Sequence, residues 1–273
     1  MSIEKIRFLD NNLVSQAVSV VSDTDYDAKD VTGVLDAYDF GLYRLTENGT
    51  LGGYVFDIEL FANLEPSCFA IVPSDVTRFF LTSETEVVLQ ASNSGFDNIE
   101  KEFTGVFSRF GAFVNIREAG VDNAYRYWRV WIKEFNRDPG EINESLDIKY
   151  FYLGDHVQID TRNIAKGIGV FNEDKSSILI AESGRRFANL KQSQLKINNL
   201  KFQAMSGSDR ANFQRFYQTV GKVENFLCIP DPGDATSAEP LELMRVMHFE
   251  KPPMQKHIVR DLFDQDFTLV EAV

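Results

Sequence analysis

The residues of this chain that have the type and spacing for chemistry suggest binding rather than catalysis. The segment Tyr125-Arg-Tyr-Trp-Arg-Val-Trp-Ile132 alternates as a β-strand does, so Tyr125, Tyr127 and Trp131 lie on one face. A ladder of aromatic rings on a strand face can stack on sugar rings or be buried in a protein interface. These three residues are therefore the candidate contact residues, with a neighbouring subunit as the favoured ligand and a glycan as the alternative. A third interpretation is that another sheet or a second domain of the chain covers this face.

One acidic segment begins like a calcium-binding loop but does not complete it. Asp23-Thr-Asp-Tyr-Asp27 has the alternating carboxylates of such a loop. The loop also needs glycine at its sixth position for a sharp turn and glutamate at its twelfth as a bidentate ligand. This sequence has Ala28 and Val34 at those positions. We therefore interpret residues 23–30 as a solvated acidic loop and predict no metal site.

Catalytic patterns are incomplete in the same way. The three histidines, His156, His248 and His257, have neither the HxxH nor the HExxH spacing of a zinc site. The segment Met205-Ser-Gly-Ser-Asp209 is not a nucleophile elbow, and its serines suit the start of a helix. Gly167-Ile-Gly169 lacks the third glycine of a dinucleotide-binding turn. The sequence thus predicts no catalytic residue, no cofactor and no enzyme activity.

The charge distribution argues against nucleic acid as a partner. Residues 1–160 carry 27 acidic and 13 basic side chains, and residues 161–273 carry 14 and 15, which gives the net charge of −13. An acidic surface repels phosphate groups, and the near-neutral second half has no basic cluster. The uneven charge also suggests two domains with separate surfaces.

Cysteine usage and hydropathy fit folding in a reducing cytoplasm. Only Cys68 and Cys228 are present, and we expect both to be buried thiols. No run of about 18 apolar residues occurs, so no membrane span is predicted. The N-terminal residues Met1–Asp10 lack the apolar region and the cleavage site of a secretory signal.

The elements that must position the aromatic ladder are short strands. Turn residues recur at short intervals through residues 1–160, which is typical of an antiparallel β-sandwich. The expected strands are Leu13–Val21, Gly53–Phe61, Cys68–Val72, Glu86–Ser92, Tyr125–Ile132 and Tyr150–Asp155. In Gly53–Phe61 alternation places Tyr54, Phe56, Ile58 and Leu60 on one face, and in Tyr125–Ile132 we expect Trp128, Val130 and Ile132 to be core residues. The Phe-rich stretch between Asn93 and Tyr125 does not fit this pattern, and we interpret it as a covering flap or a subunit interface. Its four phenylalanines are Phe103, Phe107, Phe110 and Phe113.

The second half predicts a small β domain with one helix over residues 209–220. Phe213, Phe216, Tyr217 and Val220 form one apolar stripe at helical spacing. Ser208 is the expected N-cap, and Gly221 is the expected C-terminal glycine. The strands expected around this helix lie at Ser177–Ala181, Gln194–Gln203, Val223–Ile229, Leu241–Phe249 and His257–Val273.

Several of these segments together resemble proteins of long-tailed bacteriophages. Residues 54–160 resemble the discoidin-like (galactose-binding-like) jelly-roll modules of phage tail proteins. The resemblance rests on Gly53–Phe61, Val87–Asn93, Tyr125–Val130, the turn Asn136-Arg-Asp-Pro-Gly140 and Phe151–Asp155. In the second half, Arg162-Asn-Ile-Ala-Lys-Gly167 and Leu227-Cys-Ile-Pro-Asp-Pro232 are similar to segments in the small β-barrel of distal tail and baseplate adaptor proteins.

The resemblance implies a jelly-roll β-sandwich at residues 1–160 and a distal-tail-like β-barrel domain at residues 161–273. It implies a non-enzymatic virion protein of the tail tip or baseplate that forms or decorates a ring at the distal end of the tail. The expected partners are further copies of the chain, the tail tube, the hub, and fibre or receptor-binding proteins. The expected location is the virion, after synthesis in the bacterial cytoplasm. The alternative is a carbohydrate-binding module that attaches to host-surface glycans.

Overall fold

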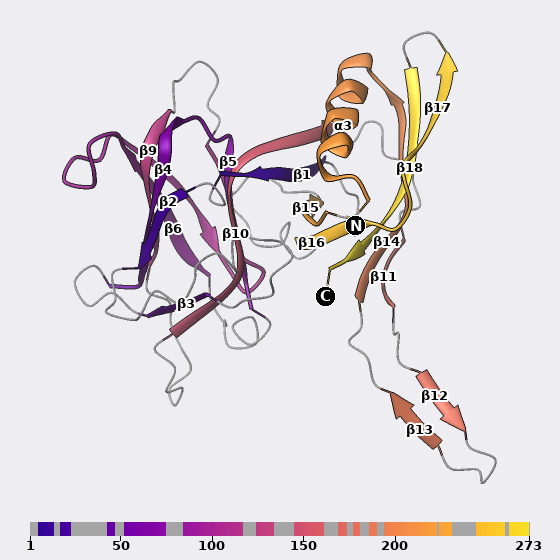
Figure 1. The fold of residues 1–273 in the computed structure, drawn as a ribbon, viewed down its shortest axis with the longest axis horizontal. Helices are drawn as coiled ribbons and strands as arrows, with labels where there is room; N and C mark the ends of the chain where they lie inside the picture. Colours follow the sequence, from indigo (N-terminus) through magenta and orange to yellow (C-terminus); the bar gives the residue numbers. More distant parts are fainter. Residues whose placement is uncertain are drawn as a thin grey trace. The chain divides into compact units, whose positions relative to one another are not determined.

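The described part of the chain is almost entirely β-structure. The computed structural model describes residues 5–13, 17–22, 43–46, 52–74, 84–116, 124–133, 145–160, 169–173, 177–180, 186–189, 194–222, 224–230, 244–259 and 262–272. Its strands pair antiparallel, and one helix is present among these residues (Figure 1). The sequence prediction of a mainly β protein with one helix is confirmed.

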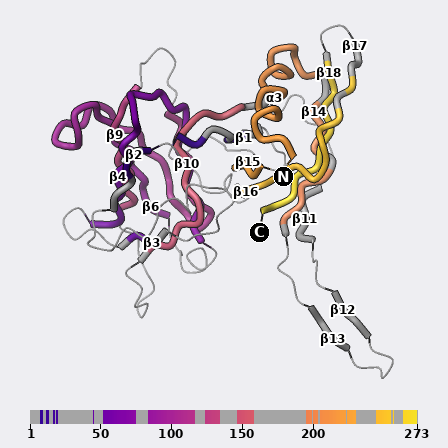
Figure 2. The backbone as a smooth tube through the Cα atoms, in the orientation of Figure 1, coloured from indigo at the N-terminus to yellow at the C-terminus, as the bar shows by residue number. Residues whose placement is uncertain are grey.

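The chain divides into two compact units, which we describe separately. One unit, here the sandwich unit, comprises residues 4–158 and 228–244, and the other, here the helical unit, comprises residues 1–3, 159–227 and 245–273. Figure 2 traces the backbone with a colour that follows the residue number. The segment 228–244 lies in the sandwich unit, whereas the sequence analysis placed it in the second domain.

The sandwich unit has two antiparallel layers. One layer has the strand order β2-β4-β9-β6-β7, and the other has the order β1-β10-β5-β8, with β3 also pairing with β10. The strands of the first layer are β2 (Ala17–Ser22), β4 (Tyr54–Leu64), β9 (Tyr125–Ile132), β6 (Thr85–Ser92) and β7 (Lys101–Phe107). Those of the second are β1 (Lys5–Asn12), β10 (Ser145–Asp160), β5 (Cys68–Pro73), β8 (Ala112–Asn115) and β3 (Tyr43–Thr46).

The core of the sandwich unit is built by strand alternation. On β4 the predicted inner face is confirmed, because Tyr54, Phe56, Ile58 and Leu60 are all buried. Phe56 meets Phe151 of the opposite layer with ring centroids 5.2 Å apart. Contacts of this kind join the two layers through one apolar core, whose burial stabilises the fold.

The Phe-rich stretch is part of this core rather than a flap or an interface. It forms β7 and β8, joined by a tight turn in which Ser108 and Gly111 exchange main-chain hydrogen bonds of 2.9 Å. Phe103, Phe107 and Phe113 are buried. The segment was misread because its phenylalanines do not follow one period. Phe103 and Phe107 lie on β7, Phe110 lies in the turn, and Phe113 lies on β8 in the other layer.

The helical unit is a sheet with a helix against it. Its sheet has the order β11-β14-β18-β16, and β17 pairs with β18. The strands are β11 (Gly169–Glu173), β14 (Gln194–Met205), β18 (Leu262–Glu271), β16 (Arg245–Phe249) and β17 (Met254–Val259). Two further strands, β12 (Ser177–Ile180) and β13 (Arg186–Asn189), form a separate two-stranded sheet, and β15 (Phe226–Pro230) follows the helix. The stretch expected as strand at 257–273 is thus a hairpin of two strands.

The helix α3 (Gly207–Val220) packs through phenylalanines. Phe213, Phe216 and Val220 are buried, as the stripe predicts. The ring of Phe213 stacks on that of Phe267 of β18 at 5.2 Å, and Phe216 meets Phe226 edge-on at 5.0 Å. These aromatic contacts fix the helix on its sheet.

The start of α3 corrects the sequence prediction. The N-cap is Ser206 and not Ser208, since Ser206 has extended backbone and its Oγ accepts the N–H of Asp209 at 3.1 Å. Both serines have the right chemistry, and only the backbone conformation distinguishes them. At the other end Gly221 has a positive φ of 58° and donates its N–H to the Tyr217 carbonyl at 2.8 Å, at the predicted position.

This cap supports a direct test. We expect Ser206→Ala to lower the free energy of unfolding of the helical unit by about 1 kcal/mol, because the Asp209 N–H loses its acceptor. The control Ser208→Ala keeps that hydrogen bond and should change stability by less than about half as much. Denaturant unfolding followed by the helical circular dichroism signal measures both, and equal losses in the two variants would contradict the assignment of Ser206.

Some predicted features lie outside the described residues. They are the acidic loop 23–30, the turn 136–140, the connector 162–167 and the last two residues of 227–232. The two cysteines are described, and both are buried thiols outside any disulfide, as predicted. Burial raises the pKa of the Cys228 thiol, so this group stays protonated and unreactive.

Candidate functional site

The aromatic ladder lies on the outer face of the first sandwich layer. The strand β9 runs between β4 and β6, and it buries Trp128, Val130 and Ile132 in the core. Tyr127 and Trp131 alternate with these residues and are half-buried. The predicted division of β9 into an inner and an outer face is therefore observed over most of its length.

Tyr125 differs from Tyr127 and Trp131 because its ring packs against the core. It is only partly buried, but its ring packs edge-on against Trp128 with centroids 5.8 Å apart, at the periphery of the core. The carbonyl of Tyr125 also accepts the indole N–H of Trp128 at 3.1 Å. The cause is a register shift of β4 between Glu59 and Leu64, which disturbs the regular alternation opposite this end of β9.

Trp131 is held in place at the other end of the strand. Its indole Nε1 donates to the Gly52 carbonyl at 2.8 Å, and Lys133 Nζ lies 5.3 Å from the ring centroid. Its cross-strand neighbours Val55 and Val88 share the outer face, yet they are only 3% and 2% exposed. The outer face is therefore closely packed around Trp131, and the indole has little freedom to reorient.

The centre of the outer face is an ion pair covered by an aromatic ring. Arg129 and Asp57 are directly opposed on β9 and β4, and both guanidinium–carboxylate hydrogen bonds measure 2.7 Å. This paired geometry is specific to arginine. The guanidinium carbon of Arg129 also lies 4.2 Å from the ring centroid of Phe96, which is a cation–π contact.

Phe96 reaches this position because the β6–β7 loop folds back over its own sheet. The Ser92 hydroxyl lies 2.7 Å from the Gly95 carbonyl and 2.8 Å from the Asn98 carbonyl and can donate to either, and the Asn93 N–H donates to Glu100 Oε1 at 2.9 Å. These bonds close the loop into a fixed turn. The sequence analysis missed Phe96 because a single phenylalanine in a polar loop has no periodic signal.

Tyr127 completes the row beside Phe96. The two rings meet edge-on at 6.4 Å, and the guanidinium carbon of Arg126 lies 5.5 Å from the Tyr127 ring centroid. Arg126 pairs with Glu59 at 2.6 Å, at the β4 register shift. On the outer face of β9, Arg129 thus lies between the rings of Tyr127 and Trp131, and Arg126 joins them at the end of the strand through Glu59 and the Tyr127 ring. We call Phe96, Arg126, Tyr127, Arg129 and Trp131 the β9 patch.

The ion pairs of the β9 patch orient its two arginine side chains. Its cations Arg126 and Arg129 are matched by Glu59 and Asp57, so the patch and these two carboxylates together carry no net charge. These pairs are partly exposed, and such pairs contribute about 0–1 kcal/mol each to stability. Their larger effect is to fix side chains that would otherwise be mobile.

Two features among the described residues bear on metal binding and on nucleophilic chemistry. No three His, Cys, Asp or Glu side chains in this part of the chain are grouped to hold a metal ion. The contact between Ser67 Oγ and His156 Nδ1, at 2.8 Å, belongs to a cross-strand link in which Ser67 also bonds Gly154, and Ser67 is only 6% exposed. None of the helical segments that the structure describes has the length and apolar character needed to cross a membrane.

Comparisons of the chain with protein-family models, with curated proteins and with solved structures found no match.

Proposed function

We propose that this chain is a non-enzymatic structural protein of a phage tail tip or baseplate, which assembles through the β9 patch. In this proposal the chain forms or decorates a ring at the distal end of the tail and connects the tube to hub or receptor-binding proteins. The protein is made in the bacterial cytoplasm and becomes part of the virion. The identity of the particle rests on the sequence resemblance to phage tail proteins, and the assembly role rests on the β9 patch.

The observation that supports assembly is the pre-organisation of the β9 patch. Tyr, Trp and Arg are the residue types enriched in the energetically important parts of protein interfaces. Here the tryptophan and both arginines of the patch have a fixed partner on their own chain: Trp131 has Gly52, Arg129 has Asp57, and Arg126 has Glu59. A surface whose long side chains are already ordered loses little conformational entropy on binding, which favours association.

The cation–ring contacts of the β9 patch favour a partner protein over a glycan as its ligand. Sugar stacking needs an open aromatic face. In the β9 patch Arg129 covers one face of Phe96, and cations lie over Tyr127 and Trp131 as well. A partner protein can instead pack on the rims of these rings and on the arginine stems.

The small sheet of β12 and β13 is a second feature that suits assembly. Its strands pair with each other from Ser177–Asn189 to Ile180–Arg186, and among the described strands they have no further partner. An isolated two-stranded sheet is marginally stable in water. Its open strand edges can add to a strand of a neighbouring copy.

We expect the purified protein to form closed oligomers, because assembly is its proposed role. Size-exclusion chromatography with light scattering measures the mass, and negative-stain images show whether rings form. The double variant Tyr127→Ala/Trp131→Ala should weaken self-association at least tenfold, because it removes both outer aromatic rings from the β9 patch.

The matched control is Phe110→Ala. Phe110 is also a half-buried ring with a cation over it, Arg109 at 4.7 Å, but it lies in the β7–β8 turn and not in the β9 patch. Its replacement should leave self-association unchanged. A wild-type protein that stays monomeric at all concentrations and never joins tail particles would refute the proposed function. Unaltered assembly of the double variant would refute the role of the patch alone.

A further inference from the structure

An exposed aromatic ring lies beside the β9 patch, at the register shift of β4. Phe61 is 55% exposed, which is the highest exposure of a large apolar side chain in the described part of the sandwich unit. It lies within the register shift between Glu59 and Leu64, opposite the end of β9 that carries Arg126. A single exposed ring is common on protein surfaces, so it indicates a contact only together with its surroundings.

Arg126 is the cation at this end of the layer, and its own chain uses only part of its hydrogen-bonding capacity. A guanidinium group has five N–H donors. Arg129 gives two of them to Asp57, whereas Arg126 gives one, from Nη2 to Glu59 Oε1 at 2.6 Å. Arg126 Nε makes no hydrogen bond within the described part of the chain, and the Arg126 side chain is 42% exposed. The guanidinium can therefore bind a second carboxylate that comes from outside the chain.

Exposed carboxylates lie at the same end of the layer. Glu65 comes directly after the pairing of Leu64 with Tyr125, and Asp97 follows Phe96 in the β6–β7 loop. Both residues are exposed, and no ion pair joins either of them to another described residue. The surface thus combines an exposed ring, a cation that can bind a carboxylate, and carboxylates that can bind a cation, so it is complementary to itself. We call Phe61, Glu65, Asp97 and Arg126 the Phe61 surface.

The charge of the chain favours a second copy as the partner of this surface. Residues 1–160 carry 27 acidic and 13 basic side chains, an excess of 14 acidic groups. Two such acidic surfaces repel each other in most orientations. A contact that brings Arg126 of each copy to carboxylates of the other replaces this repulsion by attraction. A two-fold axis provides this arrangement, because each copy then receives the contact that it gives.

We propose that two copies of the chain associate about a two-fold axis near Phe61, with Arg126 of each copy bound to Glu65 or Asp97 of the other. The inference rests on the proposed assembly role, and it identifies the partner as a second copy and the contact as isologous. Packing of the two Phe61 rings removes their exposed apolar area from water. The arginine–carboxylate pairs fix the relative orientation of the copies. A two-fold contact closes after two copies, so it joins subunits in pairs within the assembly.

Cross-linking at Asn63 tests the two-fold contact. Asn63 is exposed and lies two residues from Phe61, so its replacement leaves the ring in place. The native thiols of Cys68 and Cys228 are fully buried, so the thiol of Asn63→Cys is the accessible one. Because the two introduced thiols lie close together across the axis, a short bismaleimide should convert the protein to covalent dimers. A denaturing gel measures the yield and the rate.

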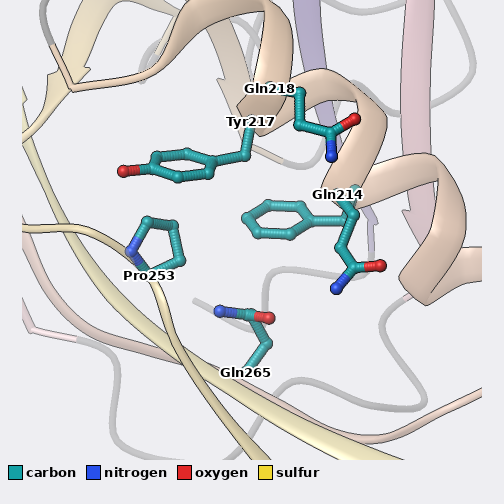
Figure 3. Close-up of a pocket in the computed structure, with 6 residues that line it drawn as sticks. Gln214, Tyr217, Gln218, Pro253 and Gln265 are labelled. Atoms are coloured by element: carbon teal, nitrogen blue, oxygen red, sulfur yellow. The ribbon is translucent and has the colours of Figure 1, made fainter.

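Met254 provides the matched control, because it is 73% exposed and belongs to the helical unit. The residue before it, Pro253, lines a small pocket together with Tyr217 and Gln265 (Figure 3). Met254 therefore shares no element with the Phe61 surface. Met254→Cys should give only the slow cross-linking of colliding molecules. Equal rates for the two cysteine variants would overturn the two-fold contact.

Two further variants test the side chains that make the contact. Phe61→Ser and Arg126→Gln should each weaken self-association about tenfold in light scattering, because aromatic rings and arginines dominate interface energies. Met254→Ser should leave self-association unchanged. The Tm of Phe61→Ser should stay that of the wild type, because the ring is exposed.

The outcomes separate this inference from the proposed function. If the wild-type protein oligomerises but Asn63→Cys forms no covalent dimer, or if Phe61→Ser and Arg126→Gln both associate normally, then the two-fold contact is wrong and the assembly role stands. If the wild-type protein is monomeric at all concentrations, both are wrong.

Discussion

Replacing Trp128 by alanine is expected to destabilise the sandwich unit by about 3–5 kcal/mol. The Trp128 side chain is fully buried, stacks near Phe103 at 6.4 Å and donates its indole N–H to the Tyr125 carbonyl. Its removal leaves a cavity between the two sandwich layers and an unpaired carbonyl at the end of β9. Since single domains have a total stability of about 5–15 kcal/mol, a loss of this size removes a large fraction of it.

The matched control is Trp131→Ala, three residues further along the same strand. Trp131 is half-buried on the outer face, so its loss should cost roughly 1–2 kcal/mol. These are the only two tryptophans, and both lie in the sandwich unit, so each variant retains one fluorescent reporter of that unit. Urea unfolding followed by fluorescence compares them directly. Equal losses in the two variants would show that the assignment of inner and outer faces on β9 is wrong.

The sequence was sufficient to predict the elements of this fold that follow a single period. Alternation correctly identified the inner residues of β4 and β9, and the helical stripe correctly identified Phe213 and Phe216. These predictions succeed because burial of one face imposes a period of two on a strand and of 3.6 on a helix. The Phe-rich stretch was misread because its phenylalanines are divided between two short strands in different layers and the turn that joins them.

The details of the candidate site could not be predicted in this way. Asp57 and Arg129 are 72 positions apart, and only the pairing of β4 with β9 brings them together. Phe96 comes from a loop, and only the fold of that loop brings it to Arg129. In each case the relevant information is a contact between distant residues, which a local pattern does not contain. The aromatic residues of β9 were found from sequence, whereas the partners that fix them were found only in the structure.

The tight turn between β7 and β8 gives the second large expected effect. Gly111 has a φ of 111°, a conformation that side-chain-bearing residues rarely adopt. A Cβ at this position would lie 2.1 Å from the Ile71 carbonyl oxygen of β5 and 2.5 Å from Met244 Cε. The methionine could rotate away, but the Ile71 carbonyl belongs to the sheet main chain beside β8.

We therefore expect Gly111→Ala to destabilise the sandwich unit by roughly 3–5 kcal/mol, of which about 1–3 come from the backbone conformation and the rest from the forced separation of β8 and β5. Gly95→Ala separates the two contributions, because Gly95 also has a positive φ, of 94°, but its Cβ would meet nothing within 4 Å. That variant should lose only the conformational part, about 1–3 kcal/mol. Urea midpoints from tryptophan fluorescence measure both variants. If Gly111→Ala is no less stable than Gly95→Ala, then the close approach of β8 to the Ile71 carbonyl does not exist in solution, and the packing of the Phe-rich hairpin into the core would have to be revised.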